Sequence, residues 1–185
     1  MAFVIDTDSP VTREEFDRLY AECFDYISVE RQRLGDETKE KLWETLTNDG
    51  VTQRKYMLDD YLVGVSAIQP VTITWQGELE TWMWYLMPTY GQTEAGSRSW
   101  WYSEDFQKVG REWCDAMGFD KVMAIHNPTS PAALAVANTW GRSWDGRQYF
   151  EPAVAHTLDE VFGDSRSDID VPDTMRAFVI AKHTE

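Results

Sequence analysis

Three strand-like runs in the middle of the chain, followed by a helix and one more apolar strand, limit the fold most strongly. The runs are rich in β-branched and aromatic residues, and they cover residues 54–60, 61–76 and 78–88. Asp59-Asp60 and Gln76-Gly77 separate the runs, as expected for hairpin turns. A helical pattern over 97–117 then precedes the apolar strand 119–127. A meander that leads into a β-α-β crossover predicts a mixed sheet.

The remaining elements are expected to surround this centre. Thr12 and Glu15 have the spacing of a capping box, which predicts a helix from Thr12 to Ile27. Further elements are predicted as a strand at 2–7, helices at 36–47 and 128–141, strands at 147–158 and 173–183, and an acidic connection at 158–173. We therefore expect one domain over residues 1–185 of mixed α/β (α+β) class, with a mostly antiparallel central sheet and helices on both faces.

The charge of the chain limits its partners. Only 17 basic residues stand against 32 acidic ones, a net charge of −15, which disfavours binding to nucleic acid. An acidic surface suits cationic amines, or it serves solubility alone. No stretch is apolar enough to predict a membrane span. The first residues lack the pattern of a secretory signal, so we expect a cytoplasmic protein with Cys23 and Cys114 reduced.

The loop before the 97–117 helix carries a family resemblance. In the GNAT superfamily of acyltransferases a strand leads into a loop of the form Arg/Gln-x-x-Gly-x-Gly/Ala, and a helix starts there. Here Gln92, Ala95 and Ser97 occupy those positions after the strand that ends at Pro88. Downstream, Asn127 and Gly141 match the family's asparagine and glycine. The chain therefore resembles a divergent GNAT protein over most of its length.

The resemblance implies a site for acetyl-CoA as cosubstrate. Backbone N–H groups at a helix start and small residues suit a pyrophosphate. The implied contacts come from Gln92, Thr93, Glu94, Ala95, Gly96, Ser97 and Arg98. Backbone N–H groups of Leu86 and Met87 are implied to polarise the thioester carbonyl, and a bulge or splay near Met87-Pro88 would expose them. Asn127 is implied to contact coenzyme A near the reacting atoms.

Acyl transfer to an amine also needs a proton acceptor and a proton donor. Glu80 is the candidate base, with Glu78 as the second choice, and Tyr149 is the candidate acid. Tyr85 and Tyr90 compete with Tyr149. His126 ends a strand beside Asn127, a place that suits a base or a buried, hydrogen-bonded histidine. Each of these side chains can instead be purely structural. The scattered histidines and cysteines predict no metal site.

This sequence departs from the family at two positions near the family's general acid. Ala137 stands where the family has a tyrosine that protonates the leaving thiolate, and Arg142 replaces a phenylalanine. The leading hypothesis is an acetyl-CoA-dependent N-acetyltransferase that acylates an amine of a small molecule or a protein directly. The alternative is a catalytically inactive GNAT-fold protein, an acidic interaction module or virion-type structural protein. A DNA mimic is a third reading of the acidity.

Overall fold

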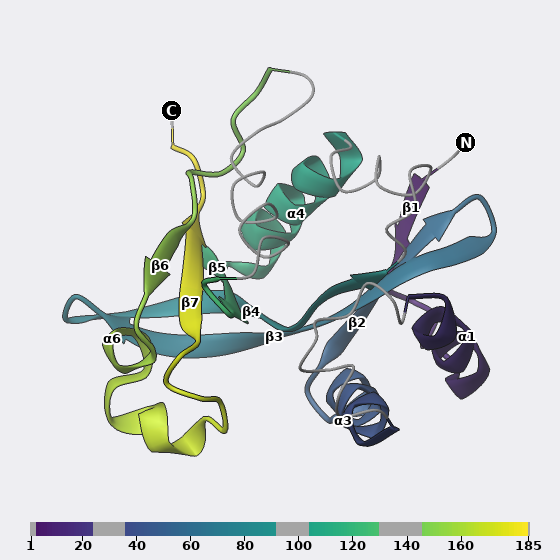
Figure 1. The fold of residues 1–185 in the computed structure, drawn as a ribbon. Coiled ribbons are helices and arrows are strands. Elements are labelled where there is room, and N and C mark those ends of the chain that lie inside the picture. Colours follow the sequence, from purple (N-terminus) through teal and green to yellow (C-terminus); the bar gives the residue numbers. More distant parts are fainter. Residues whose placement is uncertain (1–2, 24–35, 92–103, 130–145, 185) are drawn as a thin grey trace. The chain divides into compact units, whose positions relative to one another are not determined.

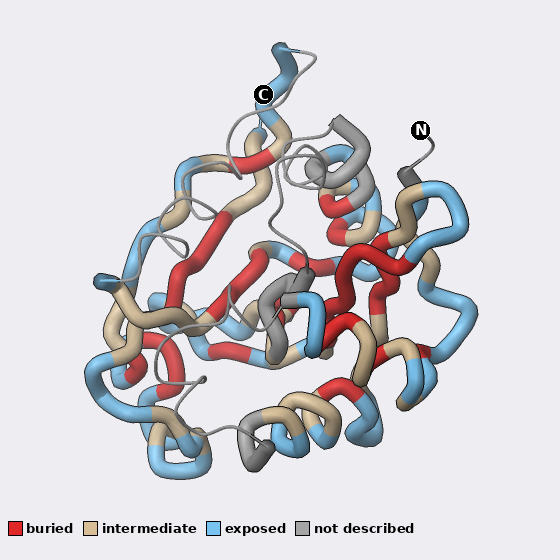
Figure 2. The backbone as a smooth tube through the Cα atoms, turned by 45° about the vertical axis from the view of Figure 1, so that its right-hand side comes forward, coloured by how far each residue is buried: buried red, intermediate tan, exposed pale blue. Residues whose placement is uncertain are grey.

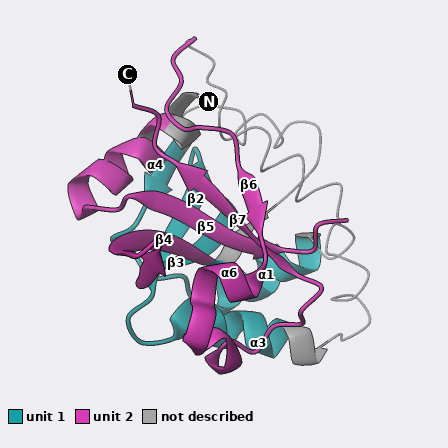
Figure 3. Cartoon of the chain, turned by 90° about the vertical axis from the view of Figure 1, so that its left-hand side faces the viewer, with its two compact units in different colours: residues 1–69, 86–101 teal, residues 70–85, 102–185 magenta. Residues whose placement is uncertain are grey.

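A computed structural model of the chain describes residues 3–23, 36–91, 104–129 and 146–184. Its chain forms two compact units (Figure 3). The first unit contains residues 1–69 and 86–101, and the second contains residues 70–85 and 102–185. Two long strands, β3 and β4, contribute to both.

The described elements largely follow the predicted order (Figure 1). In the first unit they are β1 Phe3–Asp6, α1 Arg13–Cys23, α3 Asp36–Thr47 and β2 Thr52–Leu58. The shared strands are β3 Tyr61–Trp75 and β4 Glu78–Gly91. In the second unit they are α4 Glu104–Met117, β5 Lys121–His126, β6 Val154–His156, α6 Leu158–Phe162, the 3-10 helix η3 Gly163–Asp168 and β7 Arg176–Ala181. The helix predicted at 128–141 falls mainly outside the described residues.

The described strands form one sheet in the order β1-β2-β3-β4-β5-β7-β6. Strand β2 pairs antiparallel with β1 and β3, and β7 pairs antiparallel with β5 and β6. Strands β4 and β5 pair in parallel, as their connection through α4 requires. The prediction of a mixed, mostly antiparallel sheet is confirmed.

The two predicted hairpin turns are also confirmed. Asp59 has φ 54°, and the second turn has φ 51° at Gln76 and 84° at Gly77. In the second turn, positive φ at both central residues matches the twist of the flanking strands, which explains why such a turn joins long antiparallel strands. The second turn lets β3 and β4 form a long hairpin, whose residues contribute to both units.

The first unit packs α1 and α3 on β2 and β3. The predicted capping box starts α1: the Glu15 N–H donates to Thr12 Oγ1 at 3.1 Å, and the Thr12 N–H donates to Glu15 Oε1 at 3.1 Å. The apolar core of this unit contains Val11, Phe16, Leu19, Tyr20, Leu46, Leu62, Val65 and Ala67. Arg13 pairs with Asp17 within α1 and links α1 to α3 through an ion pair with Glu40.

The second unit corrects the acidic connection predicted at 158–173. Residues 158–168 of that segment are helical, and Leu158, Val161 and Phe162 are buried. Figure 2 shows how buried and exposed stretches alternate along the chain. These three buried residues pack in one cluster with Trp82, Met123 and Val179, among others. The carboxylates in between hid this apolar pattern in the sequence. The strand predicted at 147–158 is shortened to β6, with an isolated bridge at Phe150.

Arg166 stabilises the rest of this segment. Its guanidinium donates to the carbonyl oxygens of Ile169 at 2.8 Å and Val171 at 2.7 Å, and to Asp173 Oδ1 at 2.6 Å. Helix α4 covers the opposite face of β5 and β7 (Figure 3). Every helix in the described part of the chain is too short or too polar to span a lipid bilayer.

The packing of α6 predicts a large effect of one substitution. Phe162→Ala removes a ring that lies 5.6 Å from that of Trp84, so we expect the free energy of unfolding to fall by about 3 kcal/mol. Urea denaturation measures this change. Asp164→Ala, at an exposed position of the same segment, is the matched control and should change stability by less than about 0.5 kcal/mol. Equal, small effects of both variants would contradict a packed α6.

Candidate functional site

The parallel pair β4–β5 is the feature that defines the candidate site. Its register runs through Trp82↔Lys121, Met83↔Val122, Trp84↔Met123 and Tyr85↔Ala124. Strand β4 continues to Gly91 and β5 to His126. The splay near Met87-Pro88 stays a prediction.

Residues of β5 alternate between the two faces of the sheet. Met123 and Ile125 belong to the apolar cluster around α6. Successive strand residues point to opposite faces, so Val122, Ala124 and His126 lie on the other face. Ala124 and Val122 are buried there, and His126 is half-buried. His126 is thus the last residue of β5 on this face.

Two side chains at the end of β5 have defined surroundings. The His126 ring packs at a tilt against the Phe178 ring, with centroids 5.7 Å apart. Asn127 Oδ1 accepts hydrogen bonds from the Thr129 N–H at 3.0 Å and the Thr129 hydroxyl at 2.8 Å. These two donors fix the orientation of the amide, because its oxygen must face Thr129. The amide nitrogen of Asn127 then faces away, where a ligand carbonyl could accept from it.

Glu80 lies at the opposite end of the ladder. It precedes Trp82, whose partner Lys121 is the first residue of β5. The Glu80 carboxylate is ion-paired with Lys121 and accepts from Trp82 Nε1 at 3.2 Å. The Glu80 and Lys121 side chains are only 19% and 21% exposed. The base role of Glu80 stays a prediction, and these two partners argue against it.

Tyr149 also lies far from the end of the ladder. The next residue, Phe150, bridges to Lys182, beyond the end of β7 that pairs with Lys121. This register places Tyr149 roughly 17 Å along the strand direction from Ala124, at about 3.4 Å per residue. The acid role of Tyr149 stays a prediction, but the structure does not bring Tyr149 together with His126 and Asn127.

A set of polar contacts holds the Tyr149 segment on α4. Arg111 Nη1 donates to the carbonyl oxygens of Tyr149 and His183, each at 2.8 Å. Arg111 also pairs with Asp115, which accepts from Lys182 at 3.2 Å. Burial raises the pKa of Asp115, but these two cations outweigh it and hold that pKa below its usual range. These contacts give the segment a structural function.

Sequence reasoning missed both Arg111 and Lys121. The Arg111–Asp115 pair has helical i, i+4 spacing and was visible in the sequence. The Glu80–Lys121 pair was not visible in the sequence, because it depends on the register of two strands joined through α4.

The predicted coenzyme A contacts are only partly described. Leu86 is half-buried in the first unit, and the backbone of Met87 continues β4. The loop residues Gln92, Thr93, Glu94, Ala95, Gly96, Ser97 and Arg98 lie outside the described residues, as do Ala137 and Arg142. The described part of α4 begins at Glu104, after that loop. Among the described residues, no group of three or more potential ligands could hold a metal ion.

No family model and no curated protein sequence matches the chain. Solved structures do. A Bacillus subtilis acetyltransferase in complex with CoA superposes with a TM-score of 0.56 at 11% identity, over 99% of this chain and 100% of that one. A GNAT family acetyltransferase from Staphylococcus aureus Mu50 gives 0.55 at 12% identity, over 98% and 99% of the two chains. One from Elizabethkingia anophelis with acetyl-CoA bound gives 0.55 at 11% identity, over 98% of each chain. The chain has the fold of the GNAT acetyltransferases across nearly its whole length.

Proposed function

We propose that this protein is an acyltransferase that transfers an acyl group from coenzyme A directly to an amine. The observation that carries the proposal is the parallel β4–β5 pair joined through α4, with the Asn127 amide oriented by Thr129 at the end of β5. The fold, shared with acetyltransferases whose structures contain CoA or acetyl-CoA, supports the same function.

The pantetheine arm of coenzyme A suits backbone binding along a strand. It is a narrow, extended chain with two amide groups, and such chains bind to strand edges through backbone hydrogen bonds. In this proposal the N–H groups of Leu86 and Met87 donate to the thioester carbonyl. The Asn127 amide, oriented by Thr129, donates to a carbonyl of the arm. Acetyl-CoA is the proposed acyl donor.

The pyrophosphate is assigned to residues 92–98. A net charge of −15 repels an anionic ligand at long range, so its binding must rely on local donors. Backbone N–H groups at a helix start supply such donors, and Arg98 adds a charge. Gly96 is the residue whose lack of a side chain matters most for close approach of a phosphate to the backbone.

The acceptor is proposed to be a cationic amine of a small molecule or a protein. The segment 159–173 exposes carboxylates of Asp159, Glu160, Asp164, Asp168, Asp170 and Asp173. In the resembled fold this connection flanks the acceptor side of the site. A hydrogen bond with the His156 ring and, to a smaller extent, hydrogen bonds from Thr157 lower the pKa of Glu160, which keeps that carboxylate ionised. Ionised side chains would raise the local concentration of a cation.

A catalytically inactive interaction protein is the second candidate. It is favoured by Ala137 and by the commitment of Glu80 to Lys121 and Trp82. Calorimetry with acetyl-CoA, followed by thiol release with amine acceptors, separates the two candidates. Binding with turnover supports the enzyme, whereas binding without turnover, or no binding, supports the interaction protein.

The phosphate assignment predicts the effect of a side chain at position 96. Gly96→Val should weaken acetyl-CoA binding at least tenfold, about 1.4 kcal/mol, because a branched side chain keeps the pyrophosphate from the backbone. Calorimetry measures the dissociation constant. Thr72→Val, a β-branched substitution at an exposed position of β3, is the control and should bind normally. Unchanged affinity in a folded Gly96→Val variant would contradict the assignment of the pyrophosphate to residues 92–98.

If the acidic segment 159–173 attracts the cationic acceptor, the rate of acyl transfer should depend on salt concentration. Replacing Asp164, Asp168 and Asp170 with Asn should lower kcat/KM for a cationic acceptor about three- to tenfold at low salt and flatten its dependence on ionic strength. Asp173 is left unchanged because it pairs with Arg166.

The matched control removes the same number of charges elsewhere. Glu14→Gln, Glu44→Gln and Asp49→Asn neutralise three exposed carboxylates of the first unit. If both triple variants show the same salt dependence as the parent, the acidic segment does not steer the acceptor.

A further inference from the structure

We propose that the acyl acceptor is an arylalkylamine, a primary amine carried on an aromatic group. The inference rests on the proposed acyltransferase function and names the class of its acceptor. It starts from an apolar patch that lies within the second unit, at the border of the buried cluster around α6. The patch consists of five half-buried side chains: Trp84, Ile125, Ile169, Val171 and Met175.

The burial of the sheet face under α6 decreases along β4 and β5. On β4, Trp82 is fully buried and Trp84 is half-buried. On β5, Met123 is fully buried and Ile125 is half-buried. Side chains two residues apart in a strand share a face, so each pair compares two positions under the same cover. Among the described residues, apolar surface of this unit is therefore left partly open toward the last residues of β5.

The segment after η3 contributes the other side of the patch together with negative charge. Ile169 and Val171 pack against the buried cluster, whereas Asp168 and Asp170 between and beside them are exposed. Arg166 holds this alternation in place, because its guanidinium donates to the carbonyl oxygens of Ile169 and Val171. The segment therefore brings apolar groups and carboxylates together along a few residues of chain.

The pairing of β5 with β7 places this segment at the proposed coenzyme A contact. Met175 directly precedes Arg176, and Arg176 pairs with His126, the last residue of β5. Asn127, which is proposed to contact the arm of coenzyme A, follows His126 in the same unit. The patch and that contact therefore lie at the same end of β5.

A surface of this kind fits a ligand with one apolar and one cationic end. An aromatic ring packs well on another aromatic ring such as that of Trp84, and it removes aliphatic surface from water. An ammonium group is attracted by the carboxylates of Asp168 and Asp170. An arylalkylamine has both groups, whereas a short alkylamine lacks the ring and an aryl alcohol lacks the charge.

The transfer to such an amine balances without another reactant. The bound ammonium first releases one proton to water. The neutral nitrogen then attacks the thioester carbonyl carbon, a C–N bond forms, and the C–S bond breaks with its electron pair on sulfur. The nitrogen loses a second proton, and one proton ends on sulfur. The products are an N-acyl arylalkylamine and free coenzyme A.

Three ligands test the two ends of the acceptor separately on the full-length protein. Calorimetry at low salt, without acetyl-CoA, measures the binding of phenethylamine, ethylamine and phenethyl alcohol. We expect phenethylamine to bind at least about tenfold more tightly than ethylamine, because only phenethylamine buries a ring on the patch. It should also bind at least about threefold more tightly than phenethyl alcohol, and added salt should reduce that second difference.

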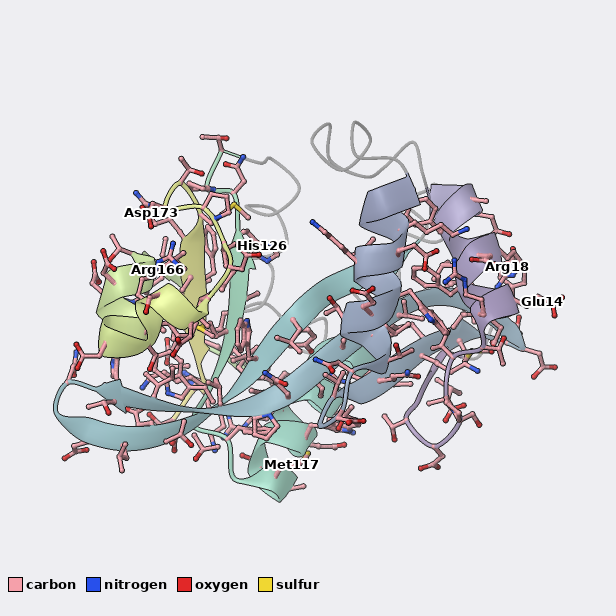
Figure 4. All side chains as sticks on the ribbon, turned by 90° about the horizontal axis from the view of Figure 1, so that it is seen from below. Glu14, Arg18, Met117, His126, Arg166 and Asp173 are labelled. Atoms are coloured by element: carbon pink, nitrogen blue, oxygen red, sulfur yellow. The ribbon has the colours of Figure 1, made fainter. Side chains whose placement is uncertain are left out.

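Two methionines on different faces of the sheet give a matched pair of variants. Met175→Ala should weaken phenethylamine binding about three- to tenfold and raise its KM in a thiol-release assay by the same factor. Met117 is 52% exposed on α4, across the sheet from Arg166 and Asp173 (Figure 4), so Met117→Ala should bind phenethylamine as the parent does. Thermal melting checks folding, and Val171→Ala replaces the Met175 variant if that one unfolds.

Each outcome supports or overturns the inference. No binding of phenethylamine, equal affinity for phenethylamine and ethylamine, or equal effects of the two methionine variants would overturn the acceptor class. Thiol release with any other amine would then leave the acyltransferase proposal intact. Phenethylamine binding that Met175→Ala weakens, without thiol release from acetyl-CoA, would support the patch as an arylalkylamine site and overturn the proposed enzyme function.

Discussion

One short set of backbone hydrogen bonds in the second unit, the parallel ladder between β4 and β5, fixes the direction and register of the strands around it. It pairs Trp82–Tyr85 with Lys121–Ala124, and β7 pairs with β5 along its whole length. The connection through α4 requires the parallel direction. This pairing brings Lys121 next to Glu80, and it puts His126 at the other end of β5.

Local signals in the sequence predicted most of the fold. Asp59 and Gln76-Gly77 define turns by backbone conformation, and Thr12 with Glu15 defines a helix start by two reciprocal hydrogen bonds. Such signals depend only on neighbouring residues. Helix α6 was missed because its three buried residues occupy barely one turn among several carboxylates. Only the tertiary contacts of Leu158, Val161 and Phe162 reveal its apolar face.

The site was harder to predict, because a sequence shows residue types but not which end of a sheet they occupy. Glu80 has the right chemistry for a base, yet the register of β4 and β5 places it beside Lys121, with which it forms an ion pair. His126, the other candidate base considered, lies at the opposite end of β5. Which residue lies at which end depends on strand direction and pairing. Both follow from the connection through α4, and neither is encoded near the two residues.

Backbone hydrogen exchange, measured with and without coenzyme A, tests most directly whether the proposed residues bind the ligand. We expect slower exchange in peptides that contain residues 86–98 and 125–129, because pantetheine and phosphate oxygens would accept hydrogen bonds from those N–H groups. Peptides from β1 and α3 should exchange as before. Protection confined to other segments, at coenzyme A concentrations that saturate the protein, would contradict the proposed coenzyme A contacts.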